Sequence, residues 1–157
     1  MSGPSIHFTA PPRSEGFTLL DILGRVTSSP GTDVQLDSEA DVLGLVEEGI
    51  STRAYEAVVV RLKLPKDAIG AETTIRNRLR SSQRLNADES ERLVRLLRVY
   101  ASASKVFGSE EKAVEWMHKA RRFIPDKPPI TPVDLAGRES GARLLEEQLL
   151  RTAHGVF

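Results

Sequence analysis

Apolar residues recur along most of the chain at the three- and four-residue spacing that places them on one face of an α-helix. The longest such stripe consists of Leu93, Leu96, Leu97, Tyr100, Ser104 and Phe107, interrupted only by the serine. The pattern predicts helices over residues 17–26, 39–48, 52–62, 65–69, 72–80, 87–107 and 140–153, with further helices after Ser109 and Thr131. Residues 58–60 also permit a strand, but no second strand-like run is available to pair with it.

Capping residues support these helix boundaries. Ser38 and Asn86 have side chains that can accept hydrogen bonds from the first turn, and Glu89 gives the Asn86 start a capping-box pattern. Gly49 and Gly108 stand where helices are expected to end. The expected fold is therefore all-α.

Composition agrees with an all-α fold. The chain has 157 residues, enough for one domain or two small ones, and only 5% of them are aromatic against 39% hydrophobic overall. A core built from Leu, Val, Ile and Ala favours helices over a β-sandwich.

Composition also narrows the function. No cysteine is present, which excludes disulfides, thiolate metal sites and a cysteine nucleophile. No apolar run approaches the roughly 20 residues that a membrane span needs. The first residues do not have the pattern of a secretion signal, so the expected location is the cytoplasm, without a membrane partner.

The net charge is zero, but the charges are unevenly distributed. Residues 33–49 contain six acidic side chains and no basic one, whereas residues 61–84 contain seven basic side chains against two acidic ones. A locally basic segment on a neutral protein can still bind a polyanion through that face.

The basic segment also has the outline of a helix-turn-helix. A short helix over 65–69, a turn at Gly70 and a helix over 72–80 would form the pair. The second helix offers side chains suited to phosphates and base edges, namely Thr73, Thr74, Arg76, Asn77, Arg78 and Arg80. The alternative is a solvated basic face on an ordinary helical bundle. The first helix is unusually short, and Ile69 rather than Gly70 falls where the turn glycine is expected.

Catalytic chemistry has little support in the sequence. The three histidines lie far apart and without metal-ligand spacing, and no nucleophile elbow or Gly-rich phosphate loop is present. We expect no enzyme activity, no cofactor and no metal. Trp116 is expected in the core. The terminal residues 151–157 either fray, as chain ends commonly do, or place an apolar pair in a partner's pocket.

Five motifs occur in order along the second half of the chain. They are ADESERLVRL at 87–96, VFGSEEKAVEWM at 106–117, TPVDL at 131–135, SGAR at 140–143 and HGVF at 154–157. This order resembles the Xre/MbcA/ParS-type antitoxins, the partners of RES-domain toxins. The resemblance covers residues 86–157 well and residues 49–85 more loosely. The loop at 121–129 departs from the short connection that is usual in the family.

The resemblance implies an Xre-like helix-turn-helix portion followed by a small helical toxin-binding domain. It implies that the antitoxin covers the active site of an ADP-ribosyltransferase-like, NAD-using toxin and represses its own operon. DNA would be read by the surface of the 72–80 helix. The toxin would be met by the last helix and tail, through Glu147, Arg151, His154, Gly155, Val156 and Phe157.

The expected organisation is a flexible N-terminal arm at 1–34, a DNA-binding portion at 35–85 and a toxin-binding domain at 86–157. The expected partners are a cognate RES-domain toxin and operator DNA, with a homodimer and a hetero-oligomer with the toxin. Two alternatives remain open. One is a free-standing helix-turn-helix regulator, and the other is an interaction adaptor that binds no DNA.

Overall fold

A computed structural model of the chain describes residues 18–31 and 34–155. Within these residues it contains eight helices and no strand, which confirms the all-α prediction. The helices are α1 (Leu19–Thr27), α2 (Glu39–Glu48), α3 (Thr52–Leu62), α4 (Glu72–Arg80), α5 (Ala87–Phe107), α6 (Glu110–Met117), α7 (Pro132–Leu135) and α8 (Glu139–Ala153).

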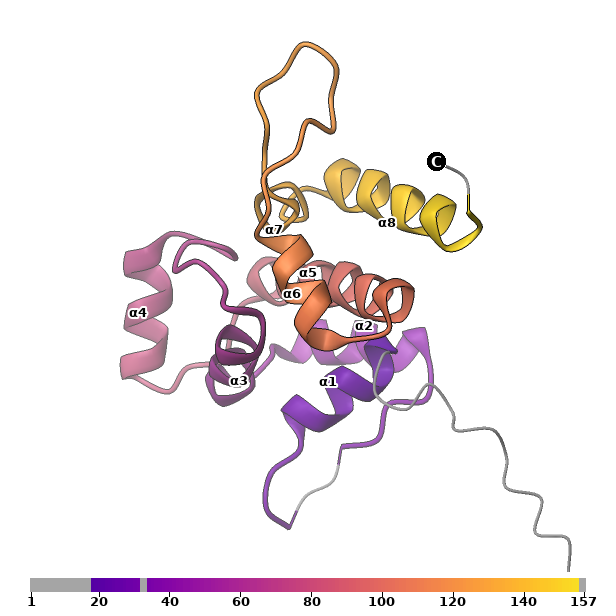
Figure 1. Ribbon diagram of the computed structural model, residues 1–157. Coiled ribbons are helices and arrows are strands. Elements are labelled where there is room, and N and C mark those ends of the chain that lie inside the picture. Colours follow the sequence, from indigo (N-terminus) through magenta and orange to yellow (C-terminus); the bar gives the residue numbers. More distant parts are fainter. Residues whose placement is uncertain (1–17, 32–33, 156–157) are drawn as a thin grey trace, which may run out of the picture.

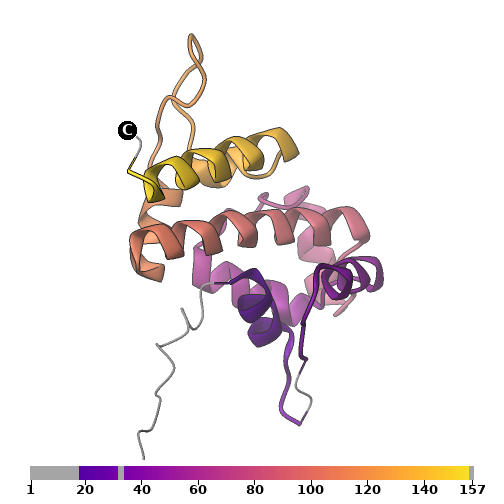
Figure 2. The same cartoon turned by 90° about the vertical axis from the view of Figure 1, so that its right-hand side faces the viewer.

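Helix α5 is the centre of the fold. It lies between α8 on one side and α1 and α2 on the other, with α6 packed against it (Figures 1 and 2). Because neighbours cover several of its faces, α5 buries residues around much of its circumference, including Leu93, Leu96, Val99 and Tyr100, all with no exposed surface. The predicted stripe therefore describes only part of the buried surface of this helix.

The predicted caps are found in the structure. Ser38 and Asn86 both form capping boxes, and Ser109 and Thr131 each accept a backbone hydrogen bond from the first turn of the next helix. Gly108 ends α5 in the left-handed conformation, with a φ of 74°. Local hydrogen bonds by these four residues thus mark the starts of four of the eight described helices.

The predicted helix over 65–69 is wrong. These residues form a turn, in which the Ala68 amide donates to the Pro65 carbonyl over 3.2 Å. The left-handed conformation of Lys63, with a φ of 52°, ends α3 just before this segment. Instead, Leu64 and Ile69 at its two ends are buried in the core. The helix that precedes α4 is therefore α3, and the two are joined by residues 63–71.

Part of the predicted flexible arm is folded. The short helix expected over 17–26 is α1, and its Ile22 and Leu23 have no exposed surface. They are buried because the three- and four-residue spacing of Leu19, Ile22 and Leu23 turns these side chains toward the core that α3 and α5 also form. Residues 1–17 of the predicted arm lie outside the described part of the chain.

Candidate functional site

Helix α8 packs closely on α7 through Gly141. A Cβ atom added at this glycine would collide with the backbone carbonyl of Leu135 and would lie 2.9 Å from the Leu135 Cδ1 atom. No larger residue therefore fits without moving one of the two helices. Ala142, Leu145 and Leu149 continue the same buried face along α8.

Arg95 of α5 holds the start of α8 in place. Its guanidinium donates to the Gly137 carbonyl over 2.9 Å and forms an ion pair with Glu139 over 3.1 Å. Because only 18% of the Arg95 side chain is exposed, water screens this ion pair less than one on an open surface. Gly141 and Arg95 together fix how α8 lies on the protein.

The outer face of α8 is exposed among the described residues. Glu147 and Arg151, both predicted toxin contacts, form an exposed ion pair of 2.6 Å one turn apart. Leu150 between them is 59% exposed, although it is a large apolar side chain. This outer face of α8 therefore combines an exposed apolar side chain with an exposed ion pair.

The described end of the chain lies just beyond α8. His154 caps the helix, and its backbone amide donates to the carbonyls of Leu150 and Arg151. Gly155 turns the chain with a φ of 70°, and a Cβ atom added there would meet no atom of the described residues within 4 Å beyond its chain neighbours. Both residues are exposed. Val156 and Phe157, the remaining predicted toxin contacts, lie outside the described residues.

Glu146 is partly buried beside α5. Its Oε1 atom is buried without a hydrogen-bond partner among the described residues. Burial raises the pKa of the Glu146 carboxyl above its ordinary value; Arg98 opposes the rise, Glu139 adds to it and Arg143 opposes it. The ionised form of this carboxyl is therefore disfavoured in the folded protein.

We expect Glu146→Gln to increase the free energy of unfolding at neutral pH by up to about 1 kcal/mol, because the amide carries no buried charge. The raised pKa means that the folded state binds the proton more tightly than the unfolded chain does. The wild type therefore gains stability as the pH falls through the folded-state pKa, and the advantage of the variant should vanish in acid. Urea unfolding of the wild type and the variant at neutral and at acidic pH measures the difference in their free energies of unfolding. Glu115→Gln, on the exposed surface of α6, is the control. An advantage that stays constant with pH would contradict the explanation.

Helix α4 carries the predicted DNA contacts at the edge of the molecule (Figure 1). Ile75 is its only fully buried residue, and Leu79 is partly buried. The outer face presents Thr73, Arg76, Asn77 and Arg80, which follow one another at helical spacing and are all exposed, while the exposed Thr74 lies on the flank. Arg76 and Arg80 form no ion pair within the described part of the chain.

Arg78 differs from the other predicted DNA contacts. Its Nε atom lies 2.6 Å from a carboxylate oxygen of Glu89, and only 23% of its side chain is exposed. The Glu89 carboxylate also accepts the Asn86 amide of the α5 capping box. The arginine is therefore engaged in joining α4 to the start of α5. The ion-pair partner lies 11 residues further along the chain, so the charge pattern of α4 alone gives no sign of it.

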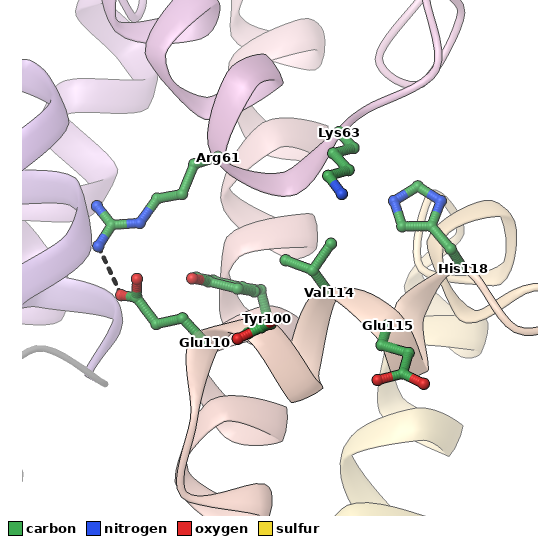
Figure 3. Close-up of a pocket in the computed structure, with 8 residues that line it drawn as sticks. Arg61, Lys63, Tyr100, Glu110, Val114, Glu115 and His118 are labelled. Carbon is green, nitrogen blue, oxygen red and sulfur yellow. Dashed lines mark hydrogen bonds and ion pairs between the residues drawn. The ribbon is translucent and has the colours of Figure 1, made fainter.

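A pocket of about 480 Å³ lies between α3 and α6 (Figure 3). Arg61 and Glu110 form an ion pair of 2.5 Å across it, which Arg25 of α1 approaches within 3.8 Å. Burial raises the pKa of the Tyr100 hydroxyl at its base. The charges in the pocket are mixed, and the ion pairs of Glu110 with Arg61 and Arg25 join α6 to α3 and α1. His118 at its rim contacts the Leu62 carbonyl over 2.8 Å.

The structure shows two further surfaces. The first is an apolar groove of about 530 Å³ between α3 and α4, beside which Val60 is 80% exposed. In the sequence, the run of three valines at 58–60 indicates only a possible strand. The second is the loop from Lys119 to Ile130. Its cationic residues follow no helical or strand periodicity, so the sequence alone does not show that they lie together. No group of three or more potential metal ligands occurs in residues 18–31 and 34–155.

Comparison with known proteins gives related antitoxins. No protein-family model matches the chain. A protein named Antitoxin Xre from Pseudomonas putida is 30% identical over 111 residues, covering 71% of this chain and 62% of that relative. A second Antitoxin Xre, from Yersinia enterocolitica, is 28% identical over 118 residues, covering 71% of this chain and 78% of that relative. The matched region is thus less than two thirds of the Pseudomonas putida protein.

These relatives bear on two predictions. Both are named as antitoxins, which agrees with the expectation of a non-catalytic protein. No helix among the described residues is long and apolar enough to span a membrane. The resemblance seen in the ordered motifs is confirmed: the chain is similar in sequence to two proteins named Antitoxin Xre.

Proposed function

We propose that this chain is an antitoxin that neutralises a RES-domain, NAD-using toxin by covering its active site with α8 and the residues that follow. The observation that carries the proposal is the division of α8 into two faces. One face is fixed on α5 and α7 through Gly141 and Leu145, and the other exposes Leu150 and the Glu147–Arg151 pair. A firmly held helix with an unoccupied apolar residue near the chain end is suited to docking in a groove.

The direct test is neutralisation in cells. We expect a RES-domain protein to be encoded beside the gene for this chain. That protein is expressed alone and together with the chain, and growth is followed. Growth arrest by the toxin alone and recovery on co-expression are expected. Persistent arrest, with no complex recovered by co-purification, would refute the proposal.

We also propose that the chain binds operator DNA through the outer face of α4 and so regulates its own operon. The support is that Arg76 and Arg80 are exposed and form no ion pair in the described part of the chain, which leaves both guanidinium groups available for phosphates or guanine. This would place DNA binding in residues 35–85 and toxin binding in residues 86–157.

Replacing Arg76 and Arg80 together with alanine is expected to weaken binding to the promoter duplex upstream of the gene. The slope of the logarithm of affinity against the logarithm of salt concentration should become shallower by about one unit for each phosphate that the variant no longer neutralises. Fluorescence anisotropy over a salt series measures both effects. Arg53→Ala with Lys105→Ala removes two exposed cations elsewhere and serves as the matched control. An equal decrease in affinity for both variants would mean that the DNA contact is not specific to α4.

A homodimer is part of the proposal, since paired half-sites bind more tightly than a single contact. The groove between α3 and α4 is a candidate dimer surface because Val60 is exposed beside it and its rim carries both signs of charge, Glu56 and Glu72 with Lys66. A patch with both signs can be complementary to itself around a two-fold axis.

Val60→Asp is expected to shift the protein toward the monomer without lowering its thermal midpoint, because an 80% exposed side chain contributes little to the core. Light scattering coupled to size-exclusion chromatography measures the mass. Leu43→Asp, at another exposed apolar position on α2, is the control. If Val60→Asp remains a dimer, the interface lies elsewhere.

Two other functions have one observation each in their favour. The exposed cations of α4 would also suit a free-standing DNA-binding regulator. The turn at residues 65–69, in place of the predicted first helix, would suit an interaction adaptor that binds no DNA. The neutralisation and anisotropy experiments separate both from the antitoxin.

A further inference from the structure

The segment between α6 and α7 extends away from the helices in both views (Figures 1 and 2). We call residues 119–130 the basic arm. Its two ends are paired, with the Arg121 amide donating to the Ile130 carbonyl over 3.0 Å and the reverse bond measuring 2.9 Å. The segment is therefore a closed projection with a defined base.

Several features restrict the conformation of the basic arm. The Lys127 amide donates to the Ile124 carbonyl over 3.3 Å near the tip, and three prolines, Pro125, Pro128 and Pro129, fix backbone φ angles. Phe123 and Ile130 are partly buried and pack against the core. A projection that is already ordered loses less entropy when it binds a partner.

The basic arm carries four exposed cations, Lys119, Arg121, Arg122 and Lys127, against the single carboxylate of Asp126. None of the four forms an ion pair in the part of the chain that the structure describes. Most other arginines of α4, α5 and α8 do have carboxylate partners. This concentration of positive charge without ion-pair partners is complementary to an acidic surface on a partner.

The position of the basic arm indicates which partner this is. The arm and α8 lie on the same side of α5 in both views, whereas α4 lies at the opposite edge of the molecule from α8 in Figure 1. Four large apolar side chains are strongly exposed among the described residues, and two of them, Ile124 and Leu150, belong to the arm and to α8. An exposed isoleucine among arginines suits a protein surface better than a phosphate backbone.

We propose that the basic arm is a second toxin-binding element, which rests on the proposed function of α8. Its cations bind an acidic surface beside the region covered by α8, and Ile124 enters an apolar depression within that surface. The two elements hold the toxin from two directions. The arm then accelerates association through its charge, while α8 and the tail supply the contacts that block the active site.

The test uses the full chain and the RES-domain protein encoded beside its gene. In one variant, Arg121, Arg122 and Lys127 are each replaced with Glu; in the control, Arg53, Lys105 and Lys112 are each replaced with Glu. The control residues are also exposed, form no ion pair in the described part of the chain, and give the same change in net charge. Association and dissociation rates are measured at low and high salt. Thermal midpoints of all proteins verify that they are folded.

We expect the arm variant to associate about tenfold or more slowly than the control at low salt, with the difference shrinking at high salt. Ile124→Ala should dissociate faster than the wild type, whereas Leu43→Ala on α2 should not. Arm and control variants with equal rates would overturn the inference. So would a decrease in promoter-duplex binding by the arm variant with toxin binding unchanged, since the arm would then contact DNA. If the wild type itself fails to bind the RES-domain protein, the proposed function fails and the inference falls with it.

Discussion

Removal of residues 154–157 is expected to raise the dissociation constant for the toxin by roughly 10²–10⁴-fold. Burying the side chains of Val156 and Phe157 in a partner pocket would contribute about 1.5–3 kcal/mol each, and each 1.4 kcal/mol corresponds to about a factor of ten. The fold should persist, because the last buried residue of α8 is Leu149 and the described residues after it are exposed. Isothermal titration with the toxin and a thermal unfolding curve measure the two effects.

A second variant separates side-chain burial from chain length. Replacing Val156 and Phe157 with serine keeps all 157 residues and removes only the apolar groups. We expect most of the decrease in affinity of the truncated chain to recur in this variant. If the truncated chain still protects cells from the toxin, the tail does not block the active site and the contact must be made by α8 alone.

Gly141→Ala is expected to lower both stability and toxin affinity. The new Cβ would overlap the Leu135 carbonyl, so α8 must move away from α7. Overpacking of this kind costs about 1–3 kcal/mol or more, which in a chain of this size lowers the thermal midpoint by roughly 2–4 °C per kcal/mol. Because α8 carries the proposed contact surface, its displacement should weaken binding as well. Chemical unfolding and titration with the toxin test both expectations.

Ser140→Ala is the matched control for this glycine. Residue 140 is the preceding position of the same helix turn and is exposed, so alanine there meets no obstacle. Its effect on stability should stay within about 0.5 kcal/mol. Equal unfolding free energies for the two variants would mean that the backbone yields at Gly141 without cost, and that its contact with α7 does not fix α8.

The helix boundaries of this protein were largely predictable from sequence because their signals are local. The side chains of Ser38, Asn86, Ser109 and Thr131 bond to amides three residues ahead, so the residues that decide each start are adjacent in sequence. The conformation of residues 65–69 is not decided by neighbouring residues in this way. It depends on the burial of Leu64 and Ile69 against distant helices, which no local pattern specifies.

The candidate binding surfaces also contain some features that local sequence predicts and others that only the tertiary structure shows. Exposure of Arg76, Asn77 and Arg80 follows from helical spacing alone. The inward position of Arg78 depends on Glu89, and the role of Gly141 depends on Leu135, so both need the tertiary structure. The motif containing Gly141 was recognisable as part of a resemblance, but the physical reason for the glycine is visible only where α7 and α8 meet.

The Glu89 carboxylate has a consequence for the dynamics of the protein. It forms an ion pair with Arg78 of α4 and accepts a hydrogen bond from the Asn86 amide at the start of α5. Glu89 is only 5% exposed. If α4 detaches, a buried charge loses its partner at the first turn of the central helix. We therefore expect the two segments to open and close together as one cooperative unit, with amide protons that exchange with solvent at a common free energy.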